Sequence, residues 1–337
     1  MRLGIAISEL DPWDFFHEIY ADLSENHQTY LFKRRQIRAP FIYERINRDI
    51  FRRDLQAFMQ TSDVVFFEWA SQLLAYATKL PKVCGMVTRL HRYEMYQWVD
   101  QVNWDAVDRV ILVSKAKQKE FSARFPDQAK NTVVIPEAVS LDKFTPNNKS
   151  FKGDIGIMCH LTPRKRVYDL LMTFYELTKR GDEFHLHIAG GPKPAFYDHY
   201  YSLLYVVAEL GIQDRVTFYG NVKDTNSWYK TIDIYISNSY SEGLQVAPME
   251  AMATGCYCLS HHWAGADELL AEDNLYYSSQ ELIEKILNYN ELPENEKITQ
   301  KARMRSIIAD RFDINYTKLQ IRNLIEDVGN HYFGISK

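Results

Sequence analysis

Short apolar runs alternate with segments of helical periodicity along most of the chain. Runs such as LGIAI, DVVFFEW and RVILVS in the first half, and DIGIMC, VTFYG and IDIYISN in the second, are apolar almost throughout. Parallel strands that are covered by helices on both faces have this composition. Segments such as VYDLLMTFYELTKRG, FYDHYYSLLYVVAELG and DELLAED stand between or after the runs and read as helices. This repeated alternation predicts α/β domains built on doubly wound parallel sheets.

A polar, turn-rich stretch, SLDKFTPNNKSFKGD, separates two such sets of strands and helices. The chain has 337 residues, which is the length of two ordinary domains. We predict an N-terminal Rossmann-like domain over 1–148 and a second Rossmann-like domain over 149–315. Residues 316–337 are predicted to form a helix that packs back on the first domain. Ligands of such sheets bind at the carboxyl ends of the strands, so the loops there are the place to look for chemistry.

Composition excludes several classes of protein. The net charge is −4, which does not point to a nucleic-acid partner, and the four cysteines are too few for a disulfide scaffold. The start of the chain reads as a strand and not as a signal peptide, and no apolar run approaches the ~18 residues of a membrane span. We therefore expect a cytoplasmic, reducing location.

The stretch SEGLQVAPMEAMATG places two glutamates around a helix start. Glu242 is predicted to lie in the loop after the strand IDIYISN, and Glu250 about one turn into the helix that follows. Backbone N–H groups near Gly243 and Leu244 and the helix dipole favour an anion, while each carboxylate can accept hydrogen bonds from sugar hydroxyls. This pattern suits a nucleotide sugar. The alternative is that the two acids only complement the helix dipole.

Four segments, in chain order, resemble glycosyltransferase family 4, the retaining group with the GT-B fold. They are VIPEAVSLDKFTP, HLTPRKRVYDLL, the long stretch from LHIAGG to RVTFYGNV, and SEGLQVAPMEAMATG. The likeness covers about Val110 to Leu270 well and the first hundred residues weakly. It implies a GT-B fold, in which two Rossmann-like domains face each other across a cleft. It also implies retaining transfer of a sugar from a nucleotide-diphosphate sugar. The domain over 1–148 would then be the acceptor side, and the domain over 149–315 would bind the nucleotide sugar.

The resemblance assigns catalytic roles to three residues. Lys165 would neutralise the departing diphosphate, assisted by His160 or Arg164, because His160 stands where the family usually has an arginine. Glu242 would hold hydroxyls of the transferred sugar, and His91 falls where the family places a histidine beside that sugar. An alternative remains open for two of these residues. Without a catalytic role, Lys165 would be a solvated residue of a basic turn, and His91 would be a structural histidine.

The resemblance also assigns residues that bind the donor without reacting. Glu250 would hold the ribose hydroxyls, and the backbone at Gly243 and Leu244 would hold the diphosphate. Asn221 and Val222, in the loop after VTFYG, would flank the base.

No metal or further cofactor is expected, since the chain has no Asp-x-Asp motif to hold a metal-bound diphosphate. The predicted enzyme is a metal-independent hexosyltransferase that uses a UDP or GDP sugar and a saccharide or lipid-linked saccharide acceptor, as in polysaccharide or glycoconjugate synthesis. One alternative is a catalytically weak relative that acts as a binding subunit. Another is a nicotinamide oxidoreductase, but the required Gly-x-Gly-x-x-Gly turn is absent.

The stretch Lys33–Arg53 is strongly basic, with eight Lys or Arg against two acids. Ile42, Ile46 and Ile50 share one face of a predicted helix in it. A basic amphipathic helix of this kind can lie on an anionic membrane, which predicts a peripheral position on its inner face. The alternative is a solvated basic face over an ordinary buried stripe.

Overall fold

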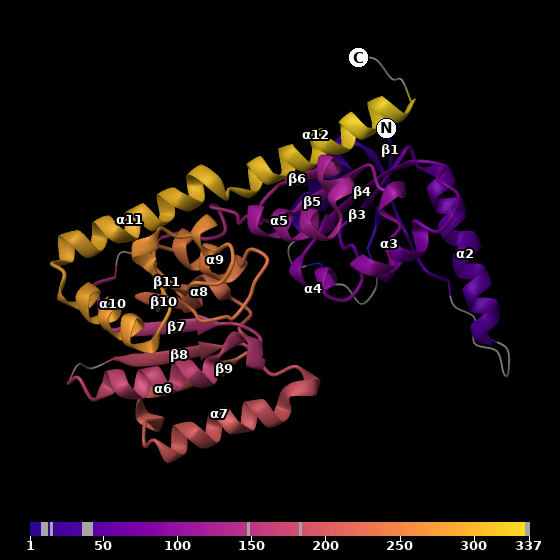
Figure 1. Cartoon of the computed structure of the whole chain (residues 1–337). Coiled ribbons are helices and arrows are strands. Elements are labelled where there is room, and N and C mark those ends of the chain that lie inside the picture. The colour runs from indigo at the N-terminus through magenta and orange to yellow at the C-terminus, as the bar shows by residue number, and fades with distance from the viewer. Residues whose placement is uncertain (8–12, 14–15, 36–42, 147–148, 182–183, 334–337) are drawn as a thin grey trace. The chain divides into compact units, whose positions relative to one another are not determined.

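The structure is a computed structural model that describes residues 1–7, 13, 16–35, 43–146, 149–181 and 184–333. The chain forms two compact units (Figure 1). Unit 1 contains residues 1–136 and 315–337, and unit 2 contains residues 137–314. Each unit is described by itself.

Unit 1 is built on a parallel sheet of six strands in the order β2-β1-β3-β4-β5-β6. The strands are β1 (Arg2–Ala6), β2 (Gln28–Leu31), β3 (Val64–Phe67), β4 (Gly85–Leu90), β5 (Arg109–Leu112) and β6 (Thr132–Val134). Since β2 and β3 flank β1 on opposite sides, the order of the strands reverses between β1 and β3. The switch point of this sheet therefore lies between β1 and β3.

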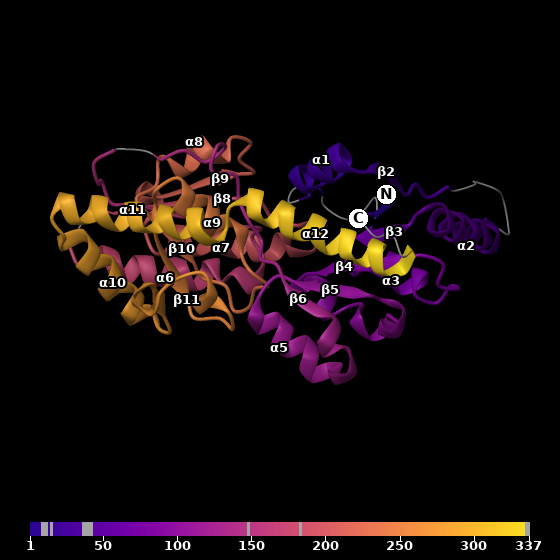
Figure 2. The same ribbon diagram turned by 90° about the horizontal axis from the view of Figure 1, so that it is seen from above.

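Helices cover both faces of this sheet. On one face lie α1 (His17–Asn26) and α12 (Ile314–Phe333), which an ion pair between Asp22 and Arg322 joins (Figure 2). On the other face, α2 (Tyr43–Thr61), α3 (Gln72–Ala77) and α5 (Lys115–Arg124) bury an apolar cluster against β3, β4 and β5. Shorter elements complete the unit: α4 (Arg92–Met95), η1 (Val99–Gln101), η2 (Trp104–Ala106) and η3 (Pro126–Asn131).

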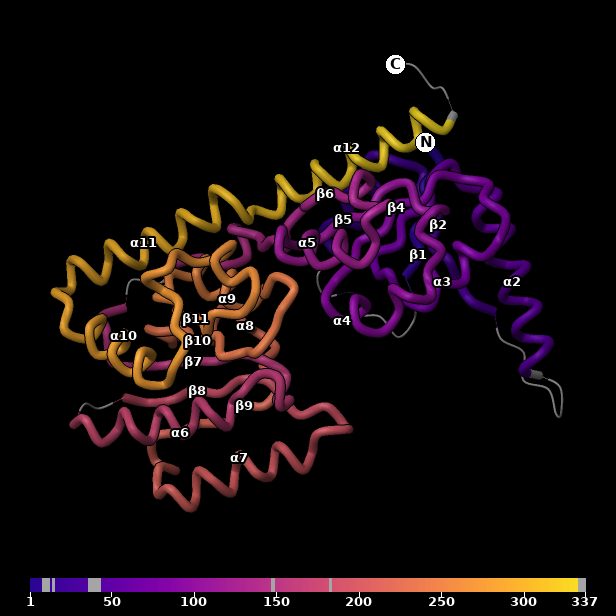
Figure 3. The backbone as a smooth tube through the Cα atoms, viewed as in Figure 1, coloured from indigo at the N-terminus to yellow at the C-terminus, as the bar shows by residue number. Residues whose placement is uncertain are grey.

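Unit 2 has a second six-stranded parallel sheet, in the order β12-β11-β10-β7-β8-β9. The strands are β7 (Asp154–Met158), β8 (His185–Ala189), β9 (Val216–Gly220), β10 (Ile234–Ser237), β11 (Tyr257–His261) and β12 (Leu275–Tyr276). Figure 3 traces the chain from β7 through α6, β8 and α7 to β9 on one side of the sheet. The order then restarts at β10 next to β7, so the switch point lies between these two strands.

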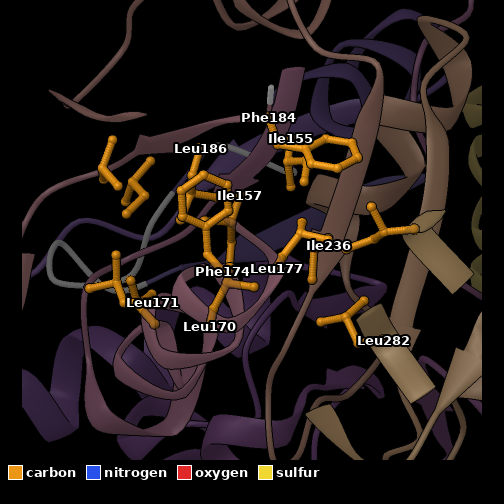
Figure 4. Packing of buried hydrophobic residues seen from close by; sticks show 14 of the residues in the cluster. Ile155, Ile157, Leu170, Leu171, Phe174, Leu177, Phe184, Leu186, Ile236 and Leu282 are labelled. Atoms are coloured by element: carbon orange, nitrogen blue, oxygen red, sulfur yellow. The ribbon is translucent and has the colours of Figure 1, made fainter. Parts of the chain in front are cut away.

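The core of unit 2 lies between its sheet and α6 (Val167–Thr178), α7 (Tyr197–Glu209) and α10 (Ser279–Glu291). Figure 4 shows how Ile155, Ile157 and Leu186 of the sheet meet Phe174 of α6 and Leu282 of α10. The other face carries α8 (Thr225–Tyr229), α9 (Val246–Ala253) and α11 (Glu294–Arg311). The 3₁₀ turns of this unit are η4 (Pro163–Lys165), η5 (Pro194–Phe196), η6 (Gln213–Arg215), η7 (Ala266–Glu268) and η8 (Glu272–Asn274).

Most of the predicted elements are present. The short strand β12 was not predicted, because two residues carry no periodicity. The segment DELLAED, 267–273, was predicted as a helix and is not one: it begins inside η7 and ends inside η8. Leu269 and Leu270, which are adjacent in sequence, are both buried. Burial of both leucines does not require a helix.

The predicted domain boundary, 148/149, lies later than the change of unit at 136/137. The polar stretch after residue 137 reads as a linker, yet it is hydrogen-bonded into unit 2. Val139 pairs with Asp313, and Arg305 Nη1 donates to the Phe144 carbonyl at 2.7 Å. At the other end, residues 315–337 belong to unit 1, where Gly329 lies close to Met1.

Candidate functional site

The loops after β7 and β10 bring one carboxylate and two cations together at the switch point of unit 2. Lys165 Nζ donates to Glu242 Oε1 at 2.7 Å, and Arg164 Nη1 lies 2.6 Å from the same oxygen. Lys165 and Glu242 are both buried, at 9% and 8% exposure. Lys165 and Glu242, which were predicted as separate site residues, are thus in direct contact, although they are 77 positions apart in sequence.

Local backbone geometry holds this arrangement. The turn after β7 forms η4 and ends at Arg166, whose φ of 53° is left-handed. The amide of Asn238 donates to the Arg166 carbonyl at 2.9 Å, which stabilises that unfavourable conformation. The backbone N–H of Tyr240 donates to the Arg164 carbonyl at 3.0 Å, and Arg164 donates to the Ser241 carbonyl at 2.8 Å. Hydrogen bonds of the protein itself therefore hold the two loops together.

The cluster Arg164–Lys165–Glu242 has a net positive charge. Burial by itself would raise the pKa of Glu242, but Lys165 and Arg164 bring this pKa below its usual value. The carboxylate is therefore ionised at neutral pH and cancels one of the two cations. One positive charge remains at the carboxyl end of a parallel sheet, which is an arrangement that attracts phosphate.

Glu250 lies in α9, one turn after its first residue, Val246, as predicted. Its Oε2 accepts a hydrogen bond from Tyr229 Oη at 2.9 Å. Burial raises the pKa of Glu250 to about 7, and the bond from Tyr229 opposes that rise. Glu242 and Glu250 are thus in different electrostatic surroundings: the first is held ionised by cations, and the second is close to its titration midpoint at neutral pH.

The start of α9 has no side-chain cap. Its N-cap residue, Gln245, instead accepts a hydrogen bond from Ser237 Oγ of β10. Gly243 and Leu244, just before this helix start, are buried. The first N–H groups of a helix need an acceptor, and an anion can supply it.

A glycine turn after β8 brings the predicted base-flanking residues to the same edge of the sheet. Gly190 has a φ of +107°, and a Cβ placed on it would lie 1.9 Å from the Cys159 carbonyl oxygen, so only glycine fits. The next residue, Gly191, accepts from Leu161 N at 3.1 Å and lies beside the side chain of Asn221. Asn221 is exposed and Val222 is half-buried.

The structure distinguishes the cations of the basic turn. Arg164 joins Lys165 at Glu242, whereas the guanidinium of Arg166 pairs with Asp169 at 2.7 Å. His160 is exposed. Of the two candidates for assisting Lys165, Arg164 is therefore the residue in contact with its carboxylate.

Unit 1 has its own buried charged cluster at the ends of β3 and β4. Arg89 Nη1 donates to Glu68 Oε1 at 3.0 Å, and all three of Glu68, Arg89 and Glu94 are 0% exposed. His91 lies between two carboxylates, with Nε2 3.7 Å from Glu68 and Nδ1 3.5 Å from Glu94. The ring of Trp69 stacks over His91 at 4.1 Å between centroids. The predicted His91 is thus a packed, oriented side chain at the carboxyl edge of its sheet.

The basic segment is only partly described, because residues 36–42, which include Ile42, lie outside the described ranges. Phe51 is buried and contacts Phe32, so it is not available to enter a lipid interface. Arg48, Arg52 and Arg53 are exposed on α2. Within the described ranges, no helix is long and apolar enough to cross a membrane.

Metal-ligating side chains do not gather in the part of the chain that the structure describes, where no group of three or more His, Cys, Asp or Glu could hold an ion. The four cysteines are buried and free. Burial raises the pKa of Cys256 to about 12, so its thiolate form is disfavoured.

Comparisons with known proteins agree with the motifs. A family model described as "Glycosyl transferases group 1" matches residues 152–290, most of unit 2. An alpha-monoglucosyldiacylglycerol synthase of Streptococcus pneumoniae is 26% identical over 201 residues, which are 53% of this chain and 44% of that protein. The resemblance to glycosyltransferase family 4 is confirmed. The chain spans less than half the length of this curated relative.

Solved structures confirm the two-domain GT-B fold with two Rossmann-like domains. The Anabaena protein Alr3699/HepE, solved in complex with UDP and glucose, superposes with a TM-score of 0.78. It is 17% identical and the match covers 97% of this chain and 100% of that one. Sucrose-phosphate synthase from Thermosynechococcus elongatus has a TM-score of 0.76 at 15% identity, covering 97% of this chain and 98% of that one. The weakly matching first hundred residues therefore share the fold even where the motifs are lost.

Two residues at the site were not predicted from the sequence, Tyr229 and Asn238. Tyr229 stands in a run of aromatic and apolar residues, NSWYKTIDIYI, which reads as core. Asn238 ends the predicted strand IDIYISN and carries no motif of its own. The positions of both next to Glu250 and the basic turn depend on the pairing of β10 with β7.

Proposed function

We propose that this chain transfers a sugar from a nucleotide-diphosphate sugar to a saccharide or lipid-linked saccharide acceptor. The observation that carries the proposal is the cluster of Arg164, Lys165 and Glu242 at the switch point of unit 2. It combines a surplus positive charge with a buried, ionised carboxylate, which suits a ligand with phosphates beside sugar hydroxyls. The family match over the same unit supports this reading.

The proposed roles follow from the contacts. Lys165 and Arg164 stabilise the negative charge that develops on the departing diphosphate, and one such donor is worth ~3 kcal/mol in typical enzymes. Glu242, already ionised, accepts hydrogen bonds from the transferred sugar. The start of α9, at Gly243 and Leu244, donates to the phosphates.

The remaining donor contacts are proposed on the same basis. Glu250 accepts from the ribose hydroxyls, Asn221 and Val222 flank the base, and the exposed His160 is a further donor to the diphosphate. In unit 1, His91 faces the transferred sugar. The name of the Anabaena structure supports UDP as the first nucleotide to test, with GDP as the alternative.

We further propose that transfer proceeds with retention and needs neither a metal ion nor a cofactor. The two cations at Glu242 support this, because they offer the diphosphate the positive charge that a metal would otherwise supply. We also propose that the protein acts in the cytoplasm, in the synthesis of polysaccharides or glycoconjugates. Peripheral contact with an anionic membrane through Lys33–Arg53 is part of this proposal, and the exposed Arg48, Arg52 and Arg53 support it.

A thermal-shift screen with UDP, GDP, ADP, UDP-glucose, GDP-mannose and NAD tests the proposal. A nucleotide present at 100 times its dissociation constant adds ~2.7 kcal/mol of stability. We expect one nucleoside diphosphate and its sugar to raise the melting temperature, and NAD to leave it unchanged. A protein that responds to none of the diphosphates and their sugars is not a transferase of this kind. If the protein binds a donor but shows neither hydrolysis nor transfer, it is a binding subunit, the alternative that the sequence left open.

A further inference from the structure

We propose that Tyr229 is a positioning residue that holds the Glu250 carboxylate ionised and oriented for the donor. This inference rests on the proposed function, because it takes the ribose hydroxyls of a nucleotide sugar as the partner of Glu250. The carrying observation is the hydrogen bond from Tyr229 Oη to Glu250 Oε2, 2.9 Å long. Because Tyr229 is 0% exposed, it acts on the ligand only through Glu250.

The side chain of Tyr229 is packed against three aromatic rings. Its ring contacts Phe144, Trp228 and Tyr235, with centroids 6.2, 5.3 and 5.8 Å away. Its own carbonyl accepts from Cys256 Sγ at 3.3 Å, which ties the end of α8 to the start of β11. A hydroxyl carried by so constrained a ring points in one direction, so it selects one rotamer of the carboxylate that it binds.

Tyr229 also links the two halves of the candidate site. Its hydroxyl lies 3.4 Å from Met158 Sδ, and Met158 is the last residue of β7, just before the basic turn. The hydroxyl has one hydrogen, and a carboxylate is a far better acceptor than a thioether. The hydrogen therefore goes to Glu250, while the sulfur contact packs the ring beneath the turn.

The charge state of Glu250 depends on few groups. Tyr229 from α8 and Lys143 from the segment before β7 act on it, whereas Tyr235 from β10 lies nearby but is uncharged, because its own pKa is raised well above its usual value. Burial raises the pKa of Glu250 to about 7, while the hydrogen bond from Tyr229 and the charge of Lys143 both lower it. Removing the hydroxyl takes away a hydrogen bond that stabilises the ionised carboxylate more than the protonated carboxyl. The pKa of Glu250 then rises further, and a larger fraction of the carboxyl is protonated at neutral pH.

The consequence for binding has a definite sign. An ionised carboxylate accepts from two ribose hydroxyls, whereas a protonated one loses acceptor capacity. Donor affinity therefore increases with pH through about 7 in the wild-type protein. In Tyr229→Phe, the same increase occurs at higher pH, so binding is weaker near neutrality and recovers in alkali.

The test is the pH dependence of UDP-glucose and GDP-mannose binding, measured by calorimetry between about pH 6 and pH 9. The phosphates of these nucleotide sugars are diesters and stay ionised throughout this range. We expect Tyr229→Phe to bind the accepted donor about threefold or more weakly at pH 7, and as well as wild type near pH 9. Thermal unfolding of each variant monitors the fold.

Tyr235→Phe is the matched control. Tyr235 is as deeply buried, but its hydroxyl bonds to the backbone of Met158, at 3.1 Å to the carbonyl. We expect its pH profile to match wild type. In a Glu250→Gln background, which has no carboxyl to titrate, adding Tyr229→Phe should change nothing further.

The outcomes separate the two proposals. If wild type binds neither nucleotide sugar, the proposed function is wrong. If wild type binds one of them and Tyr229→Phe has the same pH profile, or if Tyr235→Phe shifts it equally, Tyr229 is a packing residue and the inference is overturned.

Discussion

The two units each carry a buried charged cluster at the carboxyl edge of a parallel sheet, and the clusters differ in sign and depth. In unit 2, Arg164 and Lys165 share the single carboxylate of Glu242. In unit 1, Glu68 and Glu94 lie around Arg89 and His91. The first set has a surplus of cations. Among the described residues, the second has the permanent cation of Arg89 beside the two acids Glu68 and Glu94.

The difference in depth has a chemical meaning. Lys165 and Glu242 keep 9% and 8% of their surface exposed, whereas Glu68, Arg89 and Glu94 keep none. A cluster that reaches solvent can exchange its internal ion pair for a ligand. The fully buried part of the unit 1 cluster is mainly a support, and it orients His91, the member that is 8% exposed. Phosphate recognition is thus expected at unit 2, and positioning of a neutral, hydroxyl-rich group at unit 1.

The largest predicted effect comes from breaking the deep cluster. Arg89→Ala removes the cation 3.0 Å from Glu68 and leaves a buried carboxylate with less compensation. Losing one partner of such a pair costs about 3–5 kcal/mol. We expect urea unfolding at clearly lower denaturant concentration. Arg2→Ala, which breaks a half-exposed pair with Asp63, is the control and should shift it much less. Equal shifts in the two variants would show that burial does not distinguish the clusters.

Mutation of the cluster of unit 2 should reduce sugar transfer and leave the stability of the fold nearly unchanged. Lys165→Ala is expected to reduce sugar transfer by ~10²–10³-fold, because it removes a cation from the departing diphosphate. Its melting temperature should stay near that of wild type. Lys179→Ala, which alters an exposed pair with Glu176 on α6, serves as the matched control and should transfer normally. Unchanged transfer in Lys165→Ala would return this lysine to a structural role.

A third, smaller effect concerns the exposed arginines of helix α2 in unit 1. Each Lys or Arg near an anionic surface contributes about 1 kcal/mol, screened within a Debye length of about 10 Å. Replacing Arg48, Arg52 and Arg53 by Ser should reduce co-sedimentation with phosphatidylserine vesicles at low salt. Nucleotide binding should not change. Equal binding of the wild type to neutral and anionic vesicles would contradict an electrostatic role.

The smallest expected effect is that of a chelator. If the cations of unit 2 are sufficient for the diphosphate, EDTA should leave the initial rate of transfer unchanged. A loss of single-turnover rate that Mg²⁺ or Mn²⁺ restores would contradict metal independence. Measuring a single turnover separates the reaction from product release, which metals can also accelerate.

Much of the fold followed from local patterns. The strands β7, β9 and β10 were read from apolar runs, and Gly255, at φ +87°, ends α9 as the motif predicts. Periodicity reports burial of one element at a time, so it works where an element has enough residues to repeat. It could not find β12, which has two residues, nor show that residues 137–146 are hydrogen-bonded into unit 2.

The candidate site divides in the same way. The types and spacing of Lys165, Glu242 and Glu250 were visible in the sequence, because chemistry depends on residue type and motifs record it. Only the tertiary structure joined Lys165 to Glu242, selected Arg164 over Arg166 as its companion and placed Tyr229 on Glu250. These contacts arise from the pairing of β10 with β7, strands separated by two intervening strand–helix pairs in the chain. Charge states at the site depend on burial and on such neighbours, which is why the sequence determined the groups and the fold decided their pKa values.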